Sequence, residues 1–313
     1  MNDVNLYSKR FVLFSGKGGV GKSTIASAFA LSCARRGERT LLIELNTQDK
    51  VSAMFGVETV GTDIVEIEPN LFAVNVTPAA AMEEYAVMML KLRVIYRAIF
   101  ENRIVRAFLK AIPGLNELVM LGKAYYHVIE VNNGRHTWDK VVLDAPATGH
   151  GIFLLQIPTV ITSILSTGHM FEEAQRILAV MTDPEVTALN LVTLAEEMPV
   201  NETVMLHQRI RQDIKMPMGV VFANGLYSEM FSDEELAMLD QAQQTQSEPA
   251  VSHMIDAARF RVQRSRLQKR YLDEIAATID LPRVDVPFVF VPRLDAKALG
   301  GIAEVLDQKL GSL

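Results

Sequence analysis

Cysteine is almost absent from this chain, and its scarcity excludes several classes of protein. Cys33 is the one cysteine among 313 residues, so a single chain can form no internal disulfide and no metal cluster held by cysteines alone. A long apolar run is also missing, because the most hydrophobic stretch (residues 151–165) is too short to span a bilayer and contains Gln156 and Pro158. The first ten residues lack the apolar segment of a secretory signal. These absences predict a cytoplasmic protein without stable membrane insertion.

An excess of positive charge is missing as well. The chain carries 31 basic and 37 acidic residues, a formal net charge of −6. An anionic protein is not attracted to nucleic acid or to an acidic membrane surface, so neither is an expected partner. What the chain does have is hydrophobic residues, 49% of the total, which suffice for one large core.

The apolar residues fall into short runs that predict the strands of a sheet. Most runs are apolar throughout rather than alternating, which is typical of strands covered on both faces in a parallel sheet. They occupy residues 10–15, 40–45, 140–145, 187–194, 218–224 and 287–292. Residues 64–76 read as a hairpin with Pro69-Asn70 at its turn, and residues 22–36 as an amphipathic helix that stops at Gly37. The sequence therefore predicts an α/β, doubly wound, mostly parallel sheet of about seven to eight strands in one domain, residues 1–313.

Two helical stretches interrupt this alternation, at residues 79–131 and 151–181. Both follow strand ends on the side where such folds bind ligands, so we expect them to form one inserted helical subdomain. Several of the fifteen methionines lie in them, and two interpretations stay open: ordinary core packing, or a groove that accepts varied apolar helices. Residues 241–249 are the best candidate for a mobile loop, and the C-terminal helix is expected to pack on the sheet.

The string "SGKGGVGKST" (residues 15–24) carries the chemistry. Gly16, Gly21, Lys22 and Ser23 satisfy the pattern G-x-x-x-x-G-K-[ST] between an expected strand and an expected helix. In such a loop glycines let backbone N–H groups surround phosphate oxygens, and the helix N-terminus adds partial positive charge. Lys22 would reach the β- and γ-phosphates and the Ser23 hydroxyl would ligate Mg²⁺. The string predicts a nucleotide site.

A second lysine, Lys17, lies inside the loop itself. The fuller string "GKGGVGKS" resembles the deviant phosphate loop of the ParA, MinD, nitrogenase iron-protein and ArsA ATPases, in which the early lysine reaches phosphates bound by a facing subunit. The resemblance implies a dimer that closes with ATP, since a lysine in a water-poor interface is strongly attracted to a triphosphate. The alternative for Lys17 is a solvated loop lysine.

Other stretches indicate the branch of this group. Residues 144–150, "DAPATGH", resemble the switch II string of ArsA and of the ATPase that targets tail-anchored membrane proteins, and residues 112–117 and 183–203 are similar to further stretches of that family. The resemblance runs from residue 10 to about 295. It implies an ATP-hydrolysing enzyme that uses Mg²⁺, dimerises with an identical chain or a paralogue, and handles an apolar client such as a membrane-protein segment.

The resemblance also implies roles for individual residues. Asp144 would hold a water on Mg²⁺, Glu196 would lie near the nucleoside, and Asn224 would read adenine. Pro292 and Arg293 correspond to the adenine-side loop. The alternatives are a strand-end turn residue for Asn224 and a solvated or helix-capping acid for Glu196. The phosphates and Mg²⁺ would be bound by Gly16, Lys17, Gly18, Gly19, Val20, Gly21, Lys22, Ser23 and Thr24.

The chain departs from the family at two points. Asn46 stands where the family has the aspartate that orients or activates the attacking water, and Glu44 and Asp49 lie nearby in another register. An amide can hold a water but cannot accept its proton, so we expect slow hydrolysis. The family's zinc-binding or arsenite-binding cysteines are missing too. Two alternatives to the ATPase stay open: a nucleotide-gated regulatory or binding subunit with little hydrolysis, and an arsenite-pump subunit, which the missing cysteines count against.

Overall fold

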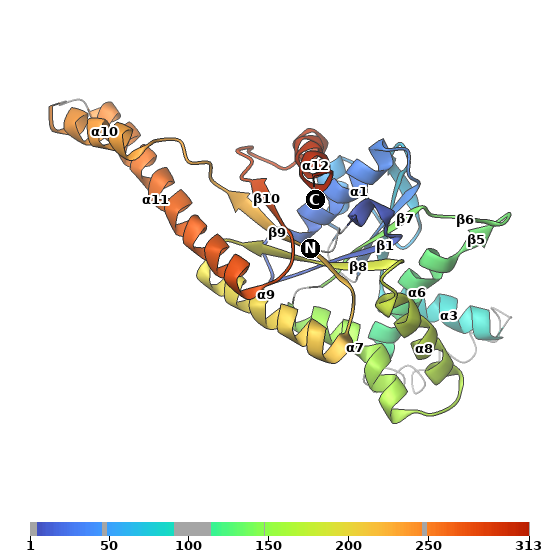
Figure 1. Ribbon diagram of the computed structural model, residues 1–313. Coiled ribbons are helices and arrows are strands. Elements are labelled where there is room, and N and C mark those ends of the chain that lie inside the picture. Colours follow the sequence, from blue (N-terminus) through green and yellow to red (C-terminus); the bar gives the residue numbers. More distant parts are fainter. Residues whose placement is uncertain (1–4, 46–48, 91–113, 147, 246–248, 313) are drawn as a thin grey trace.

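An eight-stranded sheet forms the centre of the molecule (Figure 1). The computed structural model describes residues 5–45, 49–90, 114–146, 148–245 and 249–312. The strand order is β10-β9-β8-β1-β7-β2-β4-β3, parallel throughout except for β3 against β4. This confirms the predicted doubly wound, mostly parallel α/β fold. The strands are β1 (Phe11–Ser15), β2 (Thr40–Leu45), β3 (Val65–Glu68), β4 (Leu71–Val76), β7 (Lys140–Asp144), β8 (Thr187–Leu194), β9 (Met218–Leu226) and β10 (Arg283–Pro287).

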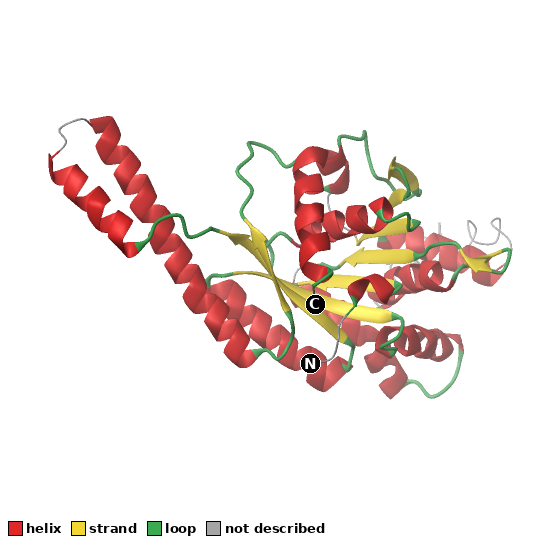
Figure 2. Cartoon of the chain, turned by 45° about the horizontal axis from the view of Figure 1, so that its top comes forward, coloured by secondary structure: helices red, strands yellow, loops and turns green. Residues whose placement is uncertain are grey.

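Helices cover both faces of this sheet (Figure 2). α1, α2 and α12 share one buried cluster with one face, and α6, α7, α8, α9 and the end of α11 share a second cluster with the other. The described helices are α1 (Lys22–Arg35), α2 (Val51–Phe55), α3 (Pro78–Leu90), α6 (Leu115–Ile129), α7 (Thr148–Ile164), α8 (His169–Thr182), α9 (Glu197–Arg209), α10 (Asp233–Thr245), α11 (Pro249–Thr278) and α12 (Ala296–Leu310). A short 3₁₀ turn (Leu6–Ser8), a π-helical turn (Ile210–Ile214) and a two-stranded ribbon of β5 (Val131–Asn132) and β6 (Arg135–His136) complete the chain.

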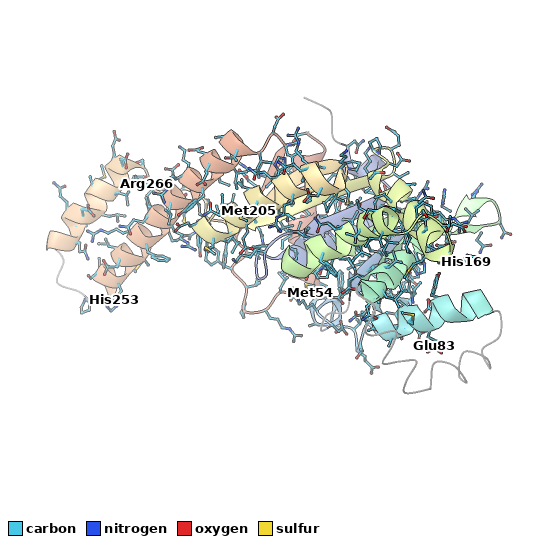
Figure 3. The ribbon with its side chains drawn as sticks, turned by 90° about the horizontal axis from the view of Figure 1, so that it is seen from below. Met54, Glu83, His169, Met205, His253 and Arg266 are labelled. Atoms are coloured by element: carbon cyan, nitrogen blue, oxygen red, sulfur yellow. The ribbon has the colours of Figure 1, made fainter. Side chains whose placement is uncertain are left out.

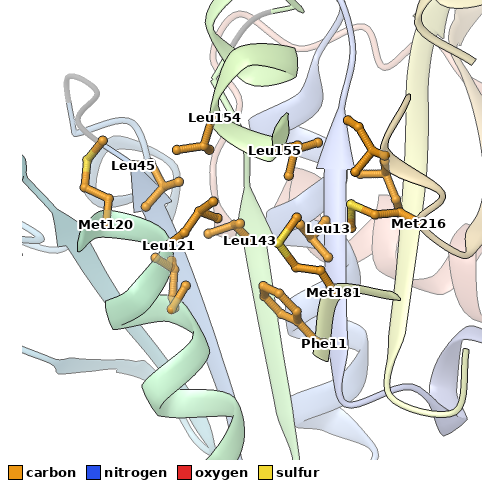
Figure 4. Packing of buried hydrophobic residues seen from close by; sticks show 14 of the residues in the cluster. Phe11, Leu13, Leu45, Met120, Leu121, Leu143, Leu154, Leu155, Met181 and Met216 are labelled. Carbon is orange, nitrogen blue, oxygen red and sulfur yellow. The ribbon is translucent and has the colours of Figure 1, made fainter. Parts of the chain in front are cut away.

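The two-sided cover explains why the strand sequences do not alternate. In β1 every residue is buried: Phe11 and Leu13 face the cluster shown in Figure 4, whereas Val12 and Phe14 face the cluster around α1. Successive side chains point to opposite faces of a strand, so a strand covered twice must be apolar at each position.

Residues at the ends of helices and strands also agree with the structure predicted from the sequence. α1 ends near Gly37, whose φ of 87° suits the turn that follows a helix, as the sequence predicts. The predicted hairpin is formed by β3 and β4, and Asn70 at its turn has a φ of 63°. α12 packs against α1 over the sheet, which confirms the expectation for the C-terminal helix.

One predicted strand is misplaced. In the apolar run at residues 287–292 only Pro287 belongs to a strand; β10 begins at Arg283 and pairs with β9 through Arg283 to Pro287. β10 lies at the sheet edge, and its residues Val284 and Val286 are buried while their neighbours are partly exposed. The alternating pattern "RVDVP" was the correct signal for this strand. The more apolar run after it contributes residues that line a pocket.

The helices expected to form a subdomain lie together beside the sheet. α6 contacts α3, α7 and α8, and α7 contacts α8. They share their buried cluster with the sheet rather than enclosing one of their own, so their separate identity stays a prediction. Residues 91–113 lie outside the described residues, and residues 131–136 contain the β5–β6 ribbon rather than helix. No helix within the described ranges is both long and apolar enough to cross a membrane.

Some of the described methionines are packed in the core and others are exposed. Within the described part of the predicted subdomain, Met120 and Met181 are buried, and Met82 and Met170 pack against the same cluster. This supports the core-packing interpretation for those four. Among the side chains that the structure describes, the exposed methionines lie on α9, α10 and α11 and in the loop before α10: Met198, Met205, Met230, Met238 and Met254.

A helical arm made of α10 and α11 projects from the edge of the sheet (Figures 1 and 2). Figure 3 shows His253 and Arg266 on this arm, at the opposite end of the molecule from His169 of α8. Arg259 of α11 pairs with Asp240 of α10 at 2.7 Å. The expectation of a mobile loop at residues 241–249 is wrong for its described part, which is helical up to residue 245 and again from residue 249.

Candidate functional site

The loop between β1 and α1 (residues 16–21, the glycine loop) needs glycine at two positions for reasons of space. A Cβ on Gly21 would overlap the side-chain amide of Asn224, and the φ of 91° at Gly21 disfavours other residues. A Cβ on Gly16 would overlap the carbonyl oxygen of Val192 in β8. The loop therefore runs tightly between neighbouring strands and ends at the N-terminus of α1. Backbone N–H groups at such a terminus suit an anion.

Lys22 folds over the glycine loop. It is the first residue of α1, 8% exposed, and its Nζ donates to the carbonyl oxygen of Lys17 at 2.9 Å. Burial lowers the pKa of Lys22, and the nearby carboxylate of Asp144 works against this shift. The ammonium is thus held at the mouth of the loop, where a bound anion would meet it.

Ser23 and Asp144 meet beneath the start of α1. The Ser23 hydroxyl donates to Asp144 Oδ2 at 2.5 Å. Asp144 ends β7, is 4% exposed, and burial raises its pKa although Ser23 and Lys22 oppose the shift. Among the described residues, Asp144 Oδ1 is buried and finds no hydrogen-bond partner. An unpaired buried carboxylate oxygen beside a hydroxyl fits a hydrated Mg²⁺, which prefers oxygen ligands and keeps several waters.

Lys17 points away from this centre. Its Nζ forms an ion pair with Glu202 of α9, and the two side chains are 29% and 30% exposed. The structure therefore gives Lys17 a partner within its own chain, neither the facing subunit of the resemblance nor open solvent. Asn46 lies outside the described residues.

A pocket of about 320 Å³ adjoins the glycine loop. Of the predicted residues, Gly19, Val20, Gly21, Thr24, Glu196 and Asn224 line it. Asn224 Nδ2 donates to the carbonyl oxygen of Val20 at 2.9 Å, and Glu196 forms an ion pair with Arg264 of α11.

Pro292 and Arg293 do not line this pocket; Arg293 donates instead to the carbonyl oxygen of Ala53 at 3.2 Å. Sequence reasoning missed the residues that take this place. The rings of Tyr227 and Phe288 stack at 5.2 Å between centroids, and Arg261 lies over the ring of Tyr227. Pro287 is the last of the alternating residues of β10 and Phe288 directly follows it, which was the signal for them. The other lining residues that were missed are Leu194, Gly225, Tyr227, Arg264, Gln268, Val289, Leu294 and Ile302.

This geometry agrees with a match to a protein family. A sequence model described as Anion-transporting ATPase, ArsA ATPase, matches residues 9–169 and 163–258. The chain belongs to the ArsA ATPase family. The family match covers the glycine loop, Asp144 and the residues of β8 and β9 that border the pocket.

Curated relatives share 24% to 29% of the aligned residues with this chain. ATPase BagA of Mycobacterium tuberculosis is 29% identical over 223 residues, which are 69% of this chain and 64% of BagA. The arsenical pump-driving ATPases of Escherichia coli and Acidiphilium multivorum are 26% and 24% identical, over 63% and 72% of this chain and 36% and 41% of their own. This chain thus spans less than two thirds of each relative.

Proposed function

We propose that this chain binds ATP at the glycine loop and hydrolyses it slowly, and that ATP favours a closed dimer. Membership of an ATPase family supports the reaction class. One observation carries the assignment: the glycine loop leads directly into Ser23, whose hydroxyl contacts the buried Asp144 at 2.5 Å. A cradle for phosphate and oxygen ligands for a cation thus meet in one place.

The roles of the residues follow from their positions. Lys22 exchanges the carbonyl oxygen of Lys17 for phosphate oxygens of ATP. Ser23 would ligate Mg²⁺ and Asp144 would hold it through a water, and the cation would supply positive charge beside the phosphates. The side-chain N–H of Asn224 donates to the carbonyl oxygen of Val20. The side-chain oxygen of Asn224 is then the atom that would accept from the amino group of adenine. Pro287 and Phe288, rather than Pro292 and Arg293, then cover the base.

The dimer is proposed because of Lys17. To reach phosphates bound by a facing chain, identical or a paralogue, Lys17 exchanges Glu202 for them. The net charge of −6 on each chain opposes association, so the attraction between Lys17 and the nucleotide has to offset it.

An apolar client remains part of the proposal. A cavity of about 710 Å³ lies between α3, α6 and α8, with Tyr85, Tyr126 and Met170 among its lining residues. Ligand sites commonly measure about 300–1,000 Å³, so this cavity has the size to accept apolar side chains of a partner.

Two alternatives are kept as outcomes of the test. A module that binds ATP and scarcely hydrolyses it is favoured by Asn46. An arsenite-pump subunit agrees with the names of two relatives, but Cys33 is buried in α1, where burial raises its pKa and disfavours the thiolate that would bind a soft metalloid. No group of three or more potential ligands from His, Cys, Asp and Glu could hold a metal within the described ranges.

Binding of a fluorescent ATP analogue and release of phosphate test the proposal on one preparation. We expect Mg²⁺-dependent binding that Lys22→Ala weakens by about tenfold or more, because a charge-assisted contact to the phosphates is lost. Lys309 is an exposed lysine on α12, so Lys309→Ala is the matched control and should bind as the wild type does. Binding without phosphate release selects the nucleotide-gated module, stimulation by arsenite selects the pump subunit, and no binding refutes all three.

A further inference from the structure

Glu44 and Asp144 occupy neighbouring positions on adjacent strands. The parallel pairing of β2 with β7 sets Glu44 beside Asp144. Leu42 and Val142, two residues earlier, both belong to the buried cluster around α1. Side chains two residues apart point to the same face, and adjacent strands lie about 4.8 Å apart. Both carboxyl groups therefore project side by side toward the start of α1, where Ser23 lies.

The carboxyl group of Glu44 is buried with an oxygen left over. Glu44 is 1% exposed, and its Oε1 accepts from the backbone N–H of Lys50 at 3.4 Å. Within the described part of the chain, Oε2 has no hydrogen-bond partner, and the same holds for Asp144 Oδ1. These two oxygens lie at the carboxyl ends of β2 and β7, which are adjacent in the sheet. Leaving two buried polar atoms unpaired is costly, so the arrangement fits a ligand that pairs with both of them.

The other nearby acid is already occupied. Asp49 Oδ1 accepts from the backbone N–H of Ser52 at 2.9 Å, and Asp49 Oδ2 accepts from that of Val60 at 2.8 Å. Asp49 thus holds the backbone around α2 together. Of the two acids near position 46, Glu44 is the one with an oxygen to offer.

We propose that Glu44 is a second carboxylate of the cation site, accepting a hydrogen bond through Oε2 from a water on the Mg²⁺ that Ser23 and Asp144 hold. This inference rests on the proposed function. Mg²⁺ keeps several of its waters in protein sites, and a second carboxylate beside the hydrated ion can accept from one of them without direct ligation. The chain thereby has a carboxylate near the cation although position 46 is an asparagine.

Cation affinity tests this without relying on turnover. Mn²⁺ replaces Mg²⁺, and its binding to the protein–ADP complex is followed by electron paramagnetic resonance. Glu44→Gln keeps the shape of the side chain and removes its charge. We expect the Kd for Mn²⁺ to rise about 10- to 100-fold, the usual effect of losing an outer-shell partner of a metal site, while ADP binding in chelator is not weakened.

Two variants serve as references. Asp49→Asn removes the same charge from a carboxylate whose oxygens are already paired, so its Kd for Mn²⁺ should change by about twofold or less. Asp144→Asn should lose the cation more severely than Glu44→Gln. Thermal unfolding without ligands checks that each variant folds; if Glu44→Gln does not, Glu44→Asp, which keeps the charge on a shorter side chain, is expected to show an intermediate loss.

The possible results distinguish the role of Glu44 from the proposed function. A wild type that binds ADP and Mn²⁺, with Glu44→Gln or the fallback Glu44→Asp indistinguishable from it, overturns the role of Glu44 and leaves the proposed function standing. A loss in Asp49→Asn equal to that in Glu44→Gln assigns the effect to general charge and also overturns it. A wild type that binds no nucleotide removes the proposed function, and the role of Glu44 with it.

Discussion

At the scale of single residues, Lys17 has one partner in the structure, Glu202, and a different partner in the proposed dimer, the phosphates of the facing nucleotide. Its ammonium pairs with Glu202 of α9, and both side chains are about one third exposed. A pair as exposed as this contributes at most about 1 kcal/mol, because water screens it. Phosphate charge in a water-poor interface attracts a lysine far more strongly. Glu202 therefore acts as a weak competitor that Lys17 can leave when ATP closes the proposed dimer.

Removing this competitor should make closure easier. In Glu202→Gln the amide cannot hold Lys17 by charge, so we expect half-maximal phosphate release at an ATP concentration about two- to fivefold lower, the factor that corresponds to an exposed ion pair. Glu197→Gln, on the same helix and also exposed, is the matched control. An unchanged or higher ATP requirement in Glu202→Gln would show that Glu202 assists Lys17 instead of competing for it.

The residues near the base show where sequence reasoning stops. The glycine loop is contiguous in the chain, so a short motif was enough to locate it. The opposite wall brings together Tyr227, Arg264, Gln268 and Phe288 from β9's end, α11 and the segment after β10. No periodicity connects positions that far apart. Their proximity depends on α11 returning to the sheet edge, which only the fold reveals.

At the scale of elements, strands buried on both faces were predictable and the arm was not. Continuous apolar runs identify β1, β2 and β7 because both faces of the sheet are covered. α10 and α11 are largely solvent-exposed and polar, so hydrophobic periodicity marks them weakly. In α11 the buried residues are widely spaced: Ile255, Val262, Gln268, Tyr271 and Ile275. Because so few of its thirty residues are buried, the sequence of this helix resembles that of an ordinary polar segment.

The end of α6 contains a titratable contact that links it to the β6–β7 connection. His127 is buried, its Nδ1 lies 3.2 Å from Glu130 Oε2, and Trp138 Nε1 donates to the same oxygen at 3.3 Å. Burial lowers the pKa of His127 below its usual value, with Glu130 opposing the shift. Between the folded pKa and the unfolded one, the unfolded chain binds more protons, so stability from this group is present above the unfolded pKa and is lost as the pH falls.

We therefore expect the contribution of His127 to the free energy of unfolding, taken as the difference between the wild type and His127→Gln, to decrease from pH 7 toward pH 5. Glu44 and Asp144, whose pKa values are raised by burial, act in the opposite direction in both proteins. The chain has one tryptophan, Trp138, so its fluorescence during denaturant unfolding reports from beside the titrating group. His253→Gln, on the exposed arm, is the control and should keep the wild-type slope. Equal slopes in His127→Gln and the wild type would mean that His127 titrates alike in both states.

At the scale of the whole molecule, the arm and the candidate site share residues. Gln268 of α11 accepts from the backbone N–H of Tyr227 at 2.8 Å and donates to the carbonyl oxygen of Gly225 at 3.0 Å, which fastens the arm to the end of β9. Arg264, one turn earlier, reaches Glu196 at the rim of the pocket. The base of the arm is thus one wall of the pocket proposed for the nucleoside.

The dimer gives the last prediction. We expect light scattering to report the 34.8 kDa of one chain with ADP and twice that mass with a non-hydrolysable ATP analogue and Mg²⁺. Lys17→Ala should stay at the mass of one chain at the same protein concentration, because the ammonium that bridges to the facing nucleotide is gone. Raising the salt concentration should shift the wild type the same way, since it screens the attraction of the interface.

The matched control is Lys50→Ala, because Lys50 is an exposed lysine outside the glycine loop whose charge acts on Asp144. Nucleotide binding by each variant is measured alongside, so that a missing dimer is not mistaken for a missing ligand. A Lys17→Ala protein that binds the analogue and reaches the dimer mass as the wild type does would assign Lys17 to its ion pair with Glu202 alone. The dimer, if it forms, would then be held by surfaces outside the glycine loop.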